Sequence, residues 1–187
     1  MQRREFLGTL AASALIGCIS GRAFANPPKD AKAVEALHTN WKEFLAAGTP
    51  VPASTDIVKH PNPEWRKLLS SQQYDVLRDE GTERAGTSPL DREKRAGVFV
   101  CAGCGLPLFT SAMKFDSGTG WPSFFTGIPG TLQTKTDYKI VFPRTEYHCA
   151  RCGGHQGHVF DDGPQPTGKR YCNNGVALRF VPKEGKA

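Results

Sequence analysis

Hydrophobic residues repeat with helical spacing in the first part of the chain and with strand spacing in the second part. Residues 30–47 carry apolar side chains three or four positions apart, which predicts one amphipathic helix. These positions are Val34, Leu37, Trp41, Phe44 and Leu45. Gly48 and Pro50 follow and are typical of a helix end.

Two shorter helices are predicted next. Residues 63–69 read as a helix with Pro63 at its first position, where a missing N–H costs nothing. Ser70 or Ser71 is a suitable N-cap for a second helix that ends near Arg78. A long polar loop is expected over residues 81–97.

After Gly97 the pattern changes to short apolar runs and two-residue alternation, separated by turn residues. Strands are predicted over 98–100, 138–142, 146–149, 157–160, 170–172 and 176–181. Pro143, Arg144 and Thr145 are predicted to form the turn of one hairpin. With 20 glycines and 14 prolines in 187 residues, the chain is rich in turns. We therefore expect a helical N-terminal segment packed on a small antiparallel β domain.

The first 25 residues have the pattern of an export signal. Arg3 and Arg4 precede an apolar run over 6–19, and Ala23-Phe24-Ala25 resembles a cleavage site. The RREFLG stretch resembles a twin-arginine signal. We expect an exported, periplasmic protein.

The leader contains two alternative processing sites. Cleavage after Ala25 is favoured, because a helix-breaking Asn-Pro-Pro follows at once. The alternative is Leu15–Cys18, which resembles a lipoprotein processing box and would leave Cys18 as a lipidated N-terminus. An uncleaved membrane anchor is a third reading.

The charge of the chain gives little support for nucleic-acid binding. The net charge is +6, with no dense block of Lys or Arg. Export also argues against a nucleic-acid partner. Contact with a membrane is expected only if Cys18 is lipidated.

Two CxxC pairs are the strongest chemical pattern in the sequence. Cys101, Cys104, Cys149 and Cys152 together offer four thiolates, the set that satisfies tetrahedral zinc with no open coordination position. One structural Zn²⁺ is therefore expected. Gly105 and Gly153 follow the second cysteine of each pair and suit tight turns. Because 44 residues separate the pairs, the metal is expected to staple two distant hairpins. Two structural disulfides or a redox-active CxxC remain as alternatives.

Cys172 is outside these pairs and is either a small buried hydrophobe or a nucleophile. Arg170 and Asn174 lie two residues away on either side, which places them on the same face of a strand. A nearby guanidinium lowers the pKa of a thiol from about 8.5, so it favours the reactive thiolate.

Two further groups of residues are candidates for a site. His155 and His158 supply acid or base capacity near neutral pH, or are simply satisfied polar residues on a strand. Trp121 and Phe124, within FDSGTGWPSF, form either a core cluster or a hydrophobic slot for a small apolar group.

Three segments, in this order, resemble the methionine sulfoxide reductase B family: CAGC with DSGTGWPSF, CARCGGHQGHVF with DDGPQPTG, and KRYCNNGVALRF. The resemblance implies two small antiparallel sheets flanked by helices, stapled by a four-cysteine zinc site. It also implies reduction of methionine-R-sulfoxide, free or in oxidised proteins, and so a role in protein repair.

The same resemblance implies roles for individual residues. Cys172 matches the nucleophile, and His155, His158 and Asn174 match residues that bind or protonate the sulfoxide oxygen. Trp121 matches the ring that receives the methyl group, while Arg170 matches an arginine near the nucleophile.

One position departs from a common pattern of that family. Many members place a resolving cysteine where this chain has Thr119. We therefore expect a one-cysteine mechanism, in which a thioredoxin-like or other thiol reductant regenerates Cys172 from its sulfenic acid. The least favoured alternative is that Cys18 is retained as a free thiol and attacks Cys172.

The expected organisation is a signal peptide over 1–25, a linker and amphipathic helix over 26–60, and a reductase domain over 61–182. The alternative from another class is a zinc-ribbon-like binding module without catalysis, for which Cys172 would be unnecessary.

Overall fold

The computed structural model describes residues 27–52, 55–138 and 143–184. The predicted leader, with both of its processing sites and Cys18, lies outside the described residues. Among the residues that are described, no helix is long and apolar enough to cross a membrane.

The N-terminal segment docks on the domain. Helix α1 (Ala31–Thr39) begins at Asp30, whose carboxylate accepts a bond from the Ala33 N–H at 2.8 Å. Val34 is buried in the core, and the His38 ring is 2.8 Å from the Thr126 hydroxyl. The segment before the β domain is therefore packed against it.

The single long helix predicted over 30–47 is wrong beyond Thr39. A separate turn of 3₁₀ helix, η1 (Trp41–Phe44), follows a break at Asn40. Thr39 and Asn40 are weak helix formers because their side chains compete for backbone bonds. The Thr39 hydroxyl bonds the carbonyl of Glu35 in this way.

Helices α2 (Asn62–Leu68) and α3 (Ser71–Asp79) confirm the two short helices. Ser70 and Gln73 form a reciprocal capping box at the start of α3. A turn of 3₁₀ helix, η2 (Pro89–Arg92), lies within the long loop that follows.

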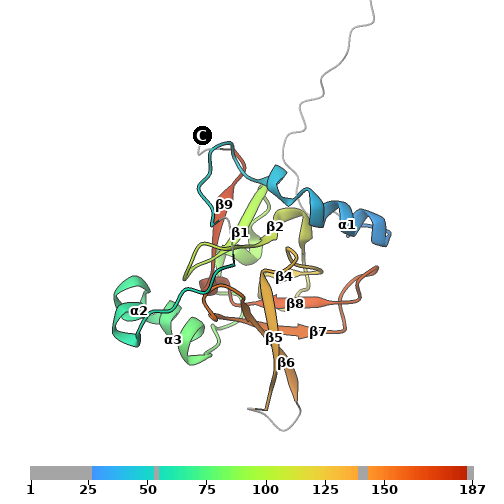
Figure 1. The fold of residues 1–187 in the computed structure, drawn as a ribbon. Helices are drawn as coiled ribbons and strands as arrows, with labels where there is room; N and C mark the ends of the chain where they lie inside the picture. The colour runs from blue at the N-terminus through green and yellow to red at the C-terminus, as the bar shows by residue number, and fades with distance from the viewer. Residues whose placement is uncertain (1–26, 53–54, 139–142, 185–187) are drawn as a thin grey trace, which may run out of the picture.

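Two antiparallel sheets form the β domain, as expected (Figure 1). The smaller has the order β2 (Pro107–Thr110), β1 (Gly97–Cys101) and β9 (Leu178–Pro182). The larger has the order β3 (Lys114–Phe115), β4 (Ser123–Phe124), β8 (Arg170–Asn173), β7 (His155–Phe160), β6 (Arg144–Cys149) and β5 (Leu132–Asp137). Short 3₁₀ turns η3 (Ser111–Met113) and η4 (Gly175–Ala177) precede β3 and β9.

The hairpin of β5 and β6 differs from its prediction. Arg144 and Thr145 are strand residues of β6 and not part of a turn. Of the strand predicted over 138–142, Tyr138 lies outside any strand and is 77% exposed, while 139–142 lie outside the described residues.

The core lies where the two sheets meet. Phe109 of the small sheet stacks on Phe124 of the large one, with ring centroids 4.0 Å apart. Phe99 and Tyr147 complete this aromatic layer, and all four side chains are fully buried. The opposite face of the large sheet takes no part in this aromatic core.

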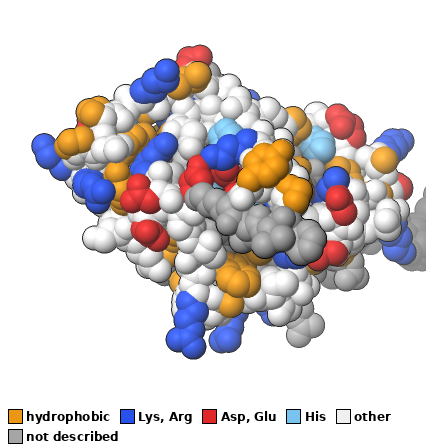
Figure 2. Space-filling view, turned by 90° about the horizontal axis from the view of Figure 1, so that it is seen from below, with side chains coloured by type: hydrophobic (Ala, Val, Ile, Leu, Met, Phe, Trp, Pro, Cys, Tyr) orange, Lys and Arg blue, Asp and Glu red, His pale blue; other side chains and the backbone are white. Residues whose placement is uncertain are grey.

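Charged side chains of both signs are interspersed on the face seen from below in Figure 2, and neither sign forms a large continuous patch there.

Candidate active site

Cys172 lies in a row of side chains that crosses the large sheet on the face away from the aromatic core. On β8 it pairs with Ser123 of β4 on one side and with His158 of β7 on the other. The row continues to Glu146 of β6 and Lys135 of β5. Because directly opposite residues in antiparallel strands point to the same face, the register places the imidazole of His158 beside the thiol.

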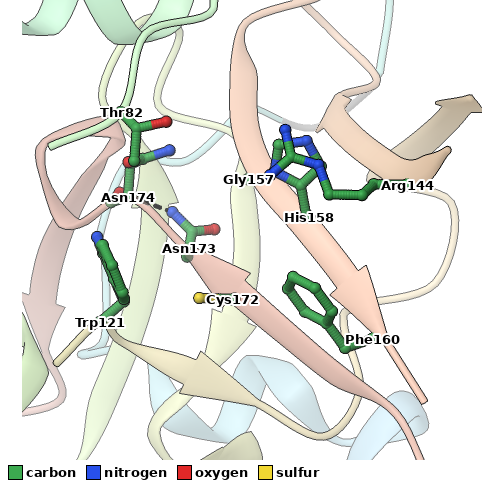
Figure 3. A pocket seen from close by; sticks show the side chains of 9 residues that line it. All are labelled: Thr82, Trp121, Arg144, Gly157, His158, Phe160, Cys172, Asn173 and Asn174. Carbon is green, nitrogen blue, oxygen red and sulfur yellow. Dashed lines mark hydrogen bonds between the residues drawn. The ribbon is translucent and has the colours of Figure 1, made fainter. Parts of the chain in front are cut away.

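A cavity of about 140 Å³ opens over Cys172. Trp121 stands on one side of the sulfur, and His158 and Phe160 stand on the other (Figure 3). The full lining is Thr82, Trp121, Arg144, Gly157, His158, Phe160, Cys172, Asn173 and Asn174. The cavity thus combines two aromatic walls with polar groups, as small-ligand sites do.

His158 is held by an acidic residue that the sequence did not reveal. Its Nε2 is 2.8 Å from Oδ2 of Asp137, the same oxygen that accepts a bond from Arg144 at 2.8 Å. Burial lowers the pKa of His158 from its usual value, the bond to Asp137 raises it, and the charge of Arg144 lowers it again. The imidazole of His158 is therefore held in one orientation at the cavity wall.

His155 lies behind this wall and does not line the cavity. It is 3% exposed, and its Nδ1 is 2.8 Å from Oε1 of Glu146. Its ring centroid is 5.5 Å from that of His158. Of the two predicted histidines, the structure places His158 at the cavity and His155 next to it.

Arg170 lowers the pKa of the Cys172 thiol, as expected, but the net shift of that pKa is upward. Burial raises the pKa of Cys172, which outweighs the lowering by Arg170 and by a hydrogen bond from Thr119. The guanidinium of Arg170 is itself paired with both oxygens of Asp162, at 2.8 Å each, and that carboxylate opposes its effect on the thiol. Asp162 was missed, although its place near the β7–β8 turn brings it back toward Arg170.

Asn174 lines the cavity, but its amide is engaged with the backbone. Its Oδ1 accepts a bond from the Glu83 N–H at 3.1 Å, and its Nδ2 donates to the carbonyl of Gln156 at 3.1 Å. Its predicted part in binding the sulfoxide oxygen stays a prediction. Asn173, which the sequence analysis passed over, lines the cavity as well.

Glu83 joins three parts of the site. Its carbonyl accepts the indole N–H of Trp121 at 3.2 Å, and its carboxylate accepts the N–H groups of Gly175 and Val176 at 2.5 and 3.0 Å. The loop before η2 thereby fixes both the Trp121 ring and the end of β8. No sequence pattern marked this residue.

Phe124 is placed differently from the expected slot. Because Ser123 shares the face of Cys172, Phe124 points to the opposite face and is 0% exposed in the core. Phe160 takes its place as the second aromatic wall, and the Arg170 guanidinium lies 4.4 Å from the Phe160 ring centroid.

The four paired cysteines converge, as predicted, into one cluster. Their sulfur atoms all lie within 4.8 Å of one another, with Cys101 and Cys152 at 3.6 Å and Cys104 and Cys149 at 3.5 Å. A disulfide needs about 2.05 Å, whereas tetrahedral coordination at about 2.3 Å separates sulfurs by roughly 3.8 Å. The cysteines are free thiols, and the cluster could hold a metal ion.

Both knuckles have the predicted turn geometry. Gly105 and Gly153 adopt φ values of +74° and +66°, which favour glycine, and each donates its N–H to the carbonyl of the first cysteine of its pair, at 2.8 and 2.9 Å. The Arg78 and Arg151 guanidinium groups bond the carbonyls of the second cysteines, Cys152 and Cys104. The cluster thus joins β1 and β6 and is tied to α3.

Gln156 connects this cluster to the cavity. Its side-chain amide donates to the sulfur of Cys101 at 3.5 Å, and its backbone carbonyl accepts the backbone N–H of Asn174 at 2.8 Å. Its Oε1 also accepts a bond from Asn173 at 3.4 Å.

A reachable thiol in a small cavity with aromatic and polar walls, separate from four thiols gathered elsewhere, is an arrangement typical of cysteine-dependent enzymes. Comparison with known proteins gives the family. The chain belongs to the SelR domain family, whose model matches residues 69–182.

Several curated relatives are about half identical to the chain. Peptide methionine sulfoxide reductase MsrB of Hahella chejuensis is 50% identical over 133 residues, which cover 71% of this chain and 96% of the relative. The protein of the same name from Methanosarcina barkeri is 50% identical over 131 residues, or 69% and 92%. The chloroplastic peptide methionine sulfoxide reductase B1 of Arabidopsis thaliana is 54% identical over 118 residues, which cover 63% of this chain and 58% of that protein.

Proposed function

We propose that this protein reduces methionine-R-sulfoxide, in oxidised proteins or as the free amino acid, to methionine. The observation that carries the proposal is the cavity itself. Cys172 lies between the Trp121 ring and the His158 imidazole. The thiolate of Cys172 can therefore attack the sulfoxide sulfur, the Trp121 ring can contact the methyl group, and the His158 imidazole can protonate the sulfoxide oxygen. Family membership and the names of the relatives support the same activity.

The reaction transfers one oxygen atom from the sulfur of the substrate to the sulfur of Cys172. The Cys172 thiolate attacks the sulfoxide sulfur while the sulfoxide oxygen is protonated, with His158 as the donor at the cavity wall. This attack forms an S–S bond. That bond and the S–O bond of the substrate then break as the hydroxyl group bonds to the Cys172 sulfur, which becomes a sulfenic acid. The substrate sulfur gains two electrons and Cys172 loses two, and the released product is methionine.

Aromatic and polar walls have separate tasks in this step. The Trp121 face offers an apolar surface to the ε-methyl group, and its indole N–H is already used by Glu83, which fixes the ring. Asn174 and His155 are held by buried hydrogen bonds and support the polar wall.

The second half of the cycle needs an external thiol. Thr119, where many related enzymes place a resolving cysteine, has a hydroxyl that lowers the pKa of the Cys172 thiol and cannot form a disulfide with it. The other four cysteines of the described residues belong to the cluster. Two equivalents of a thiol, from a thioredoxin-like protein or another reductant, reduce the sulfenic acid to the thiol and release water and a disulfide.

We further propose that the four-cysteine cluster holds one structural Zn²⁺. Four thiolates leave no position for a substrate, so the ion would stabilise the joined hairpins and take no part in the oxygen transfer. Export by the twin-arginine route, which carries folded proteins, is proposed from the RREFLG leader. N-terminal sequencing of the exported protein would test cleavage after Ala25 against processing at Cys18.

The activity is tested with dabsyl-methionine-R-sulfoxide and its S epimer, with dithiothreitol as reductant. We expect wild type to reduce the R epimer selectively and Cys172→Ser to be inactive while keeping its metal content and thermal stability. Equal, background-level turnover by both proteins with metal bound would favour a binding module instead.

A further inference from the structure

A chain of three hydroxyl groups leads away from the Cys172 sulfur. The Thr119 hydroxyl is placed so that hydrogen bonding to the sulfur lowers the pKa of the Cys172 thiol. It lies 2.8 Å from the Ser117 hydroxyl, which lies 2.7 Å from that of Ser123. Ser123, fully buried and directly opposite Cys172 in the sheet, donates to the Trp121 carbonyl at 3.1 Å.

The protons of this chain can be counted. Four hydrogen-bond gaps separate the sulfur from the Trp121 carbonyl, and the three hydroxyls supply one proton each. A Cys172 thiol adds a fourth proton, so every gap is filled when all groups donate toward Trp121. A thiolate only accepts, and the Thr119 proton must then turn toward the sulfur. The ionisation of Cys172 and the direction of the chain are therefore linked.

We propose that the Thr119 hydroxyl is a catalytic donor to the Cys172 thiolate, and that Ser117 and Ser123 are positioning residues that orient it. The inference rests on the proposed role of Cys172 as nucleophile and deepens it. It matters because burial opposes the thiolate and the charge of Arg170 is opposed by Asp162. A hydrogen bond to a charged sulfur is stronger than one to a neutral group and is well placed to offset part of that burial.

The test measures the ionisation of Cys172 and not turnover. Metal-loaded protein is alkylated with iodoacetamide over a range of pH, and the Cys172 peptide is quantified by mass spectrometry. In Thr119→Val the midpoint should rise by about one pH unit, so that alkylation near neutral pH slows about tenfold. Ser117→Ala, which keeps Thr119 but removes its partner, should slow it about threefold.

Two matched variants make the result specific. Thr119→Ser keeps the hydroxyl and should restore the wild-type profile within about twofold. Thr126→Val makes the same change where the hydroxyl instead contacts His38, and should leave the profile unchanged. A wild-type profile in both Thr119→Val and Ser117→Ala would overturn the inference, as would a shift that Thr119→Ser fails to reverse.

Activity assays separate this inference from the proposed function. An inactive wild type whose Cys172 still shows the hydroxyl-dependent profile would contradict the reductase proposal alone. Full reductase activity with an unchanged profile in Thr119→Val would contradict the hydroxyl chain alone.

Discussion

His158 lies directly opposite Cys172 on the neighbouring strand of the large sheet, and its imidazole is held 2.8 Å from Asp137. The proposed nucleophile and the proposed acid are thus fixed by backbone pairing, and not by the conformation of a flexible loop. Their separation is set by the spacing of adjacent strands, which is among the most constant distances in protein structure.

Replacement of Asp137 by Asn should move the alkaline limb of the pH–rate profile to lower pH. The Asp137 carboxylate raises the pKa of His158, so its loss leaves less imidazolium to protonate the substrate. We expect the rate at mildly alkaline pH to fall about tenfold or more. Arg144→Gln is the opposite control, because the arginine charge lowers the same pKa. Identical limbs in both variants would contradict the role of His158.

Stability should decline as the pH falls below about 6.5. Burial lowers the pKa of both His148 and His158, so the unfolded chain binds protons at these two sites before the folded protein does. Each imidazole therefore costs stability as the pH drops from the unfolded pKa to the folded one. Urea unfolding at mildly alkaline and mildly acidic pH would measure this, and His148→Gln should show a flatter dependence than wild type.

Changes at Arg170 and Asp162 should shift the Cys172 thiol in opposite directions. Arg170→Gln removes a cation that lowers the pKa of Cys172, and Asp162→Asn removes an anion that raises it. The first variant should react more slowly with iodoacetamide near neutral pH and the second faster, each by roughly threefold to tenfold. Shifts of the same sign would show that the salt bridge acts only by positioning.

Loss of the proposed zinc ion should destabilise the fold without a direct chemical effect at Cys172. Cys101→Ser removes a fully buried ligand, and at about 2–4 °C per kcal/mol a loss of roughly 4 kcal/mol lowers the Tm by about 8–16 °C. Calorimetry with metal analysis checks this. Cys172→Ser is the control, with a Tm and a metal content equal to those of wild type.

At Glu83, the hydrogen bonds that its carboxylate accepts should matter more for stability than its charge. Burial raises the pKa of its carboxyl, so the charged form is not favoured by its surroundings. The two oxygens accept from separate N–H groups, so Glu83→Gln keeps one acceptor but replaces the other with a donor, and should cost about 1–2 kcal/mol. Glu83→Ala leaves those buried N–H groups unsatisfied and should cost about 2–4 kcal/mol. Equal losses in urea unfolding would contradict this.

The sequence predicted the elements whose signal is local. The cap at Ser70, the two glycine turns at Gly105 and Gly153, and the convergence of four cysteines all follow from short motifs and were confirmed. Strand β5 was missed because LQTKTD is polar on both faces, so it lacks the alternation that marks a half-buried strand.

Residues that act through distant contacts could not be predicted in the same way. Asp137 lies at the end of the missed strand, and its pairing with His158 depends on the order of strands β5, β6 and β7. Phe124 was assigned to the substrate slot because the face of a two-residue strand cannot be read without its neighbours. Arg170 was correctly placed beside Cys172, but Asp162 opposes its charge there.

Gln156 gives the molecule one further property. A single amide touches a sulfur of the stapling cluster, while the backbone of the same residue holds Asn174 at the cavity. We therefore expect damage at the cluster to disturb the cavity, because one residue contacts both. An oxidant that strips the cluster should disable the cavity in the same event, so inactivated molecules should be found without metal and without a formed pocket together. We then expect the four-cysteine cluster, and not the Cys172 thiol that is oxidised and regenerated in each turnover, to limit how long the protein stays active under oxidation.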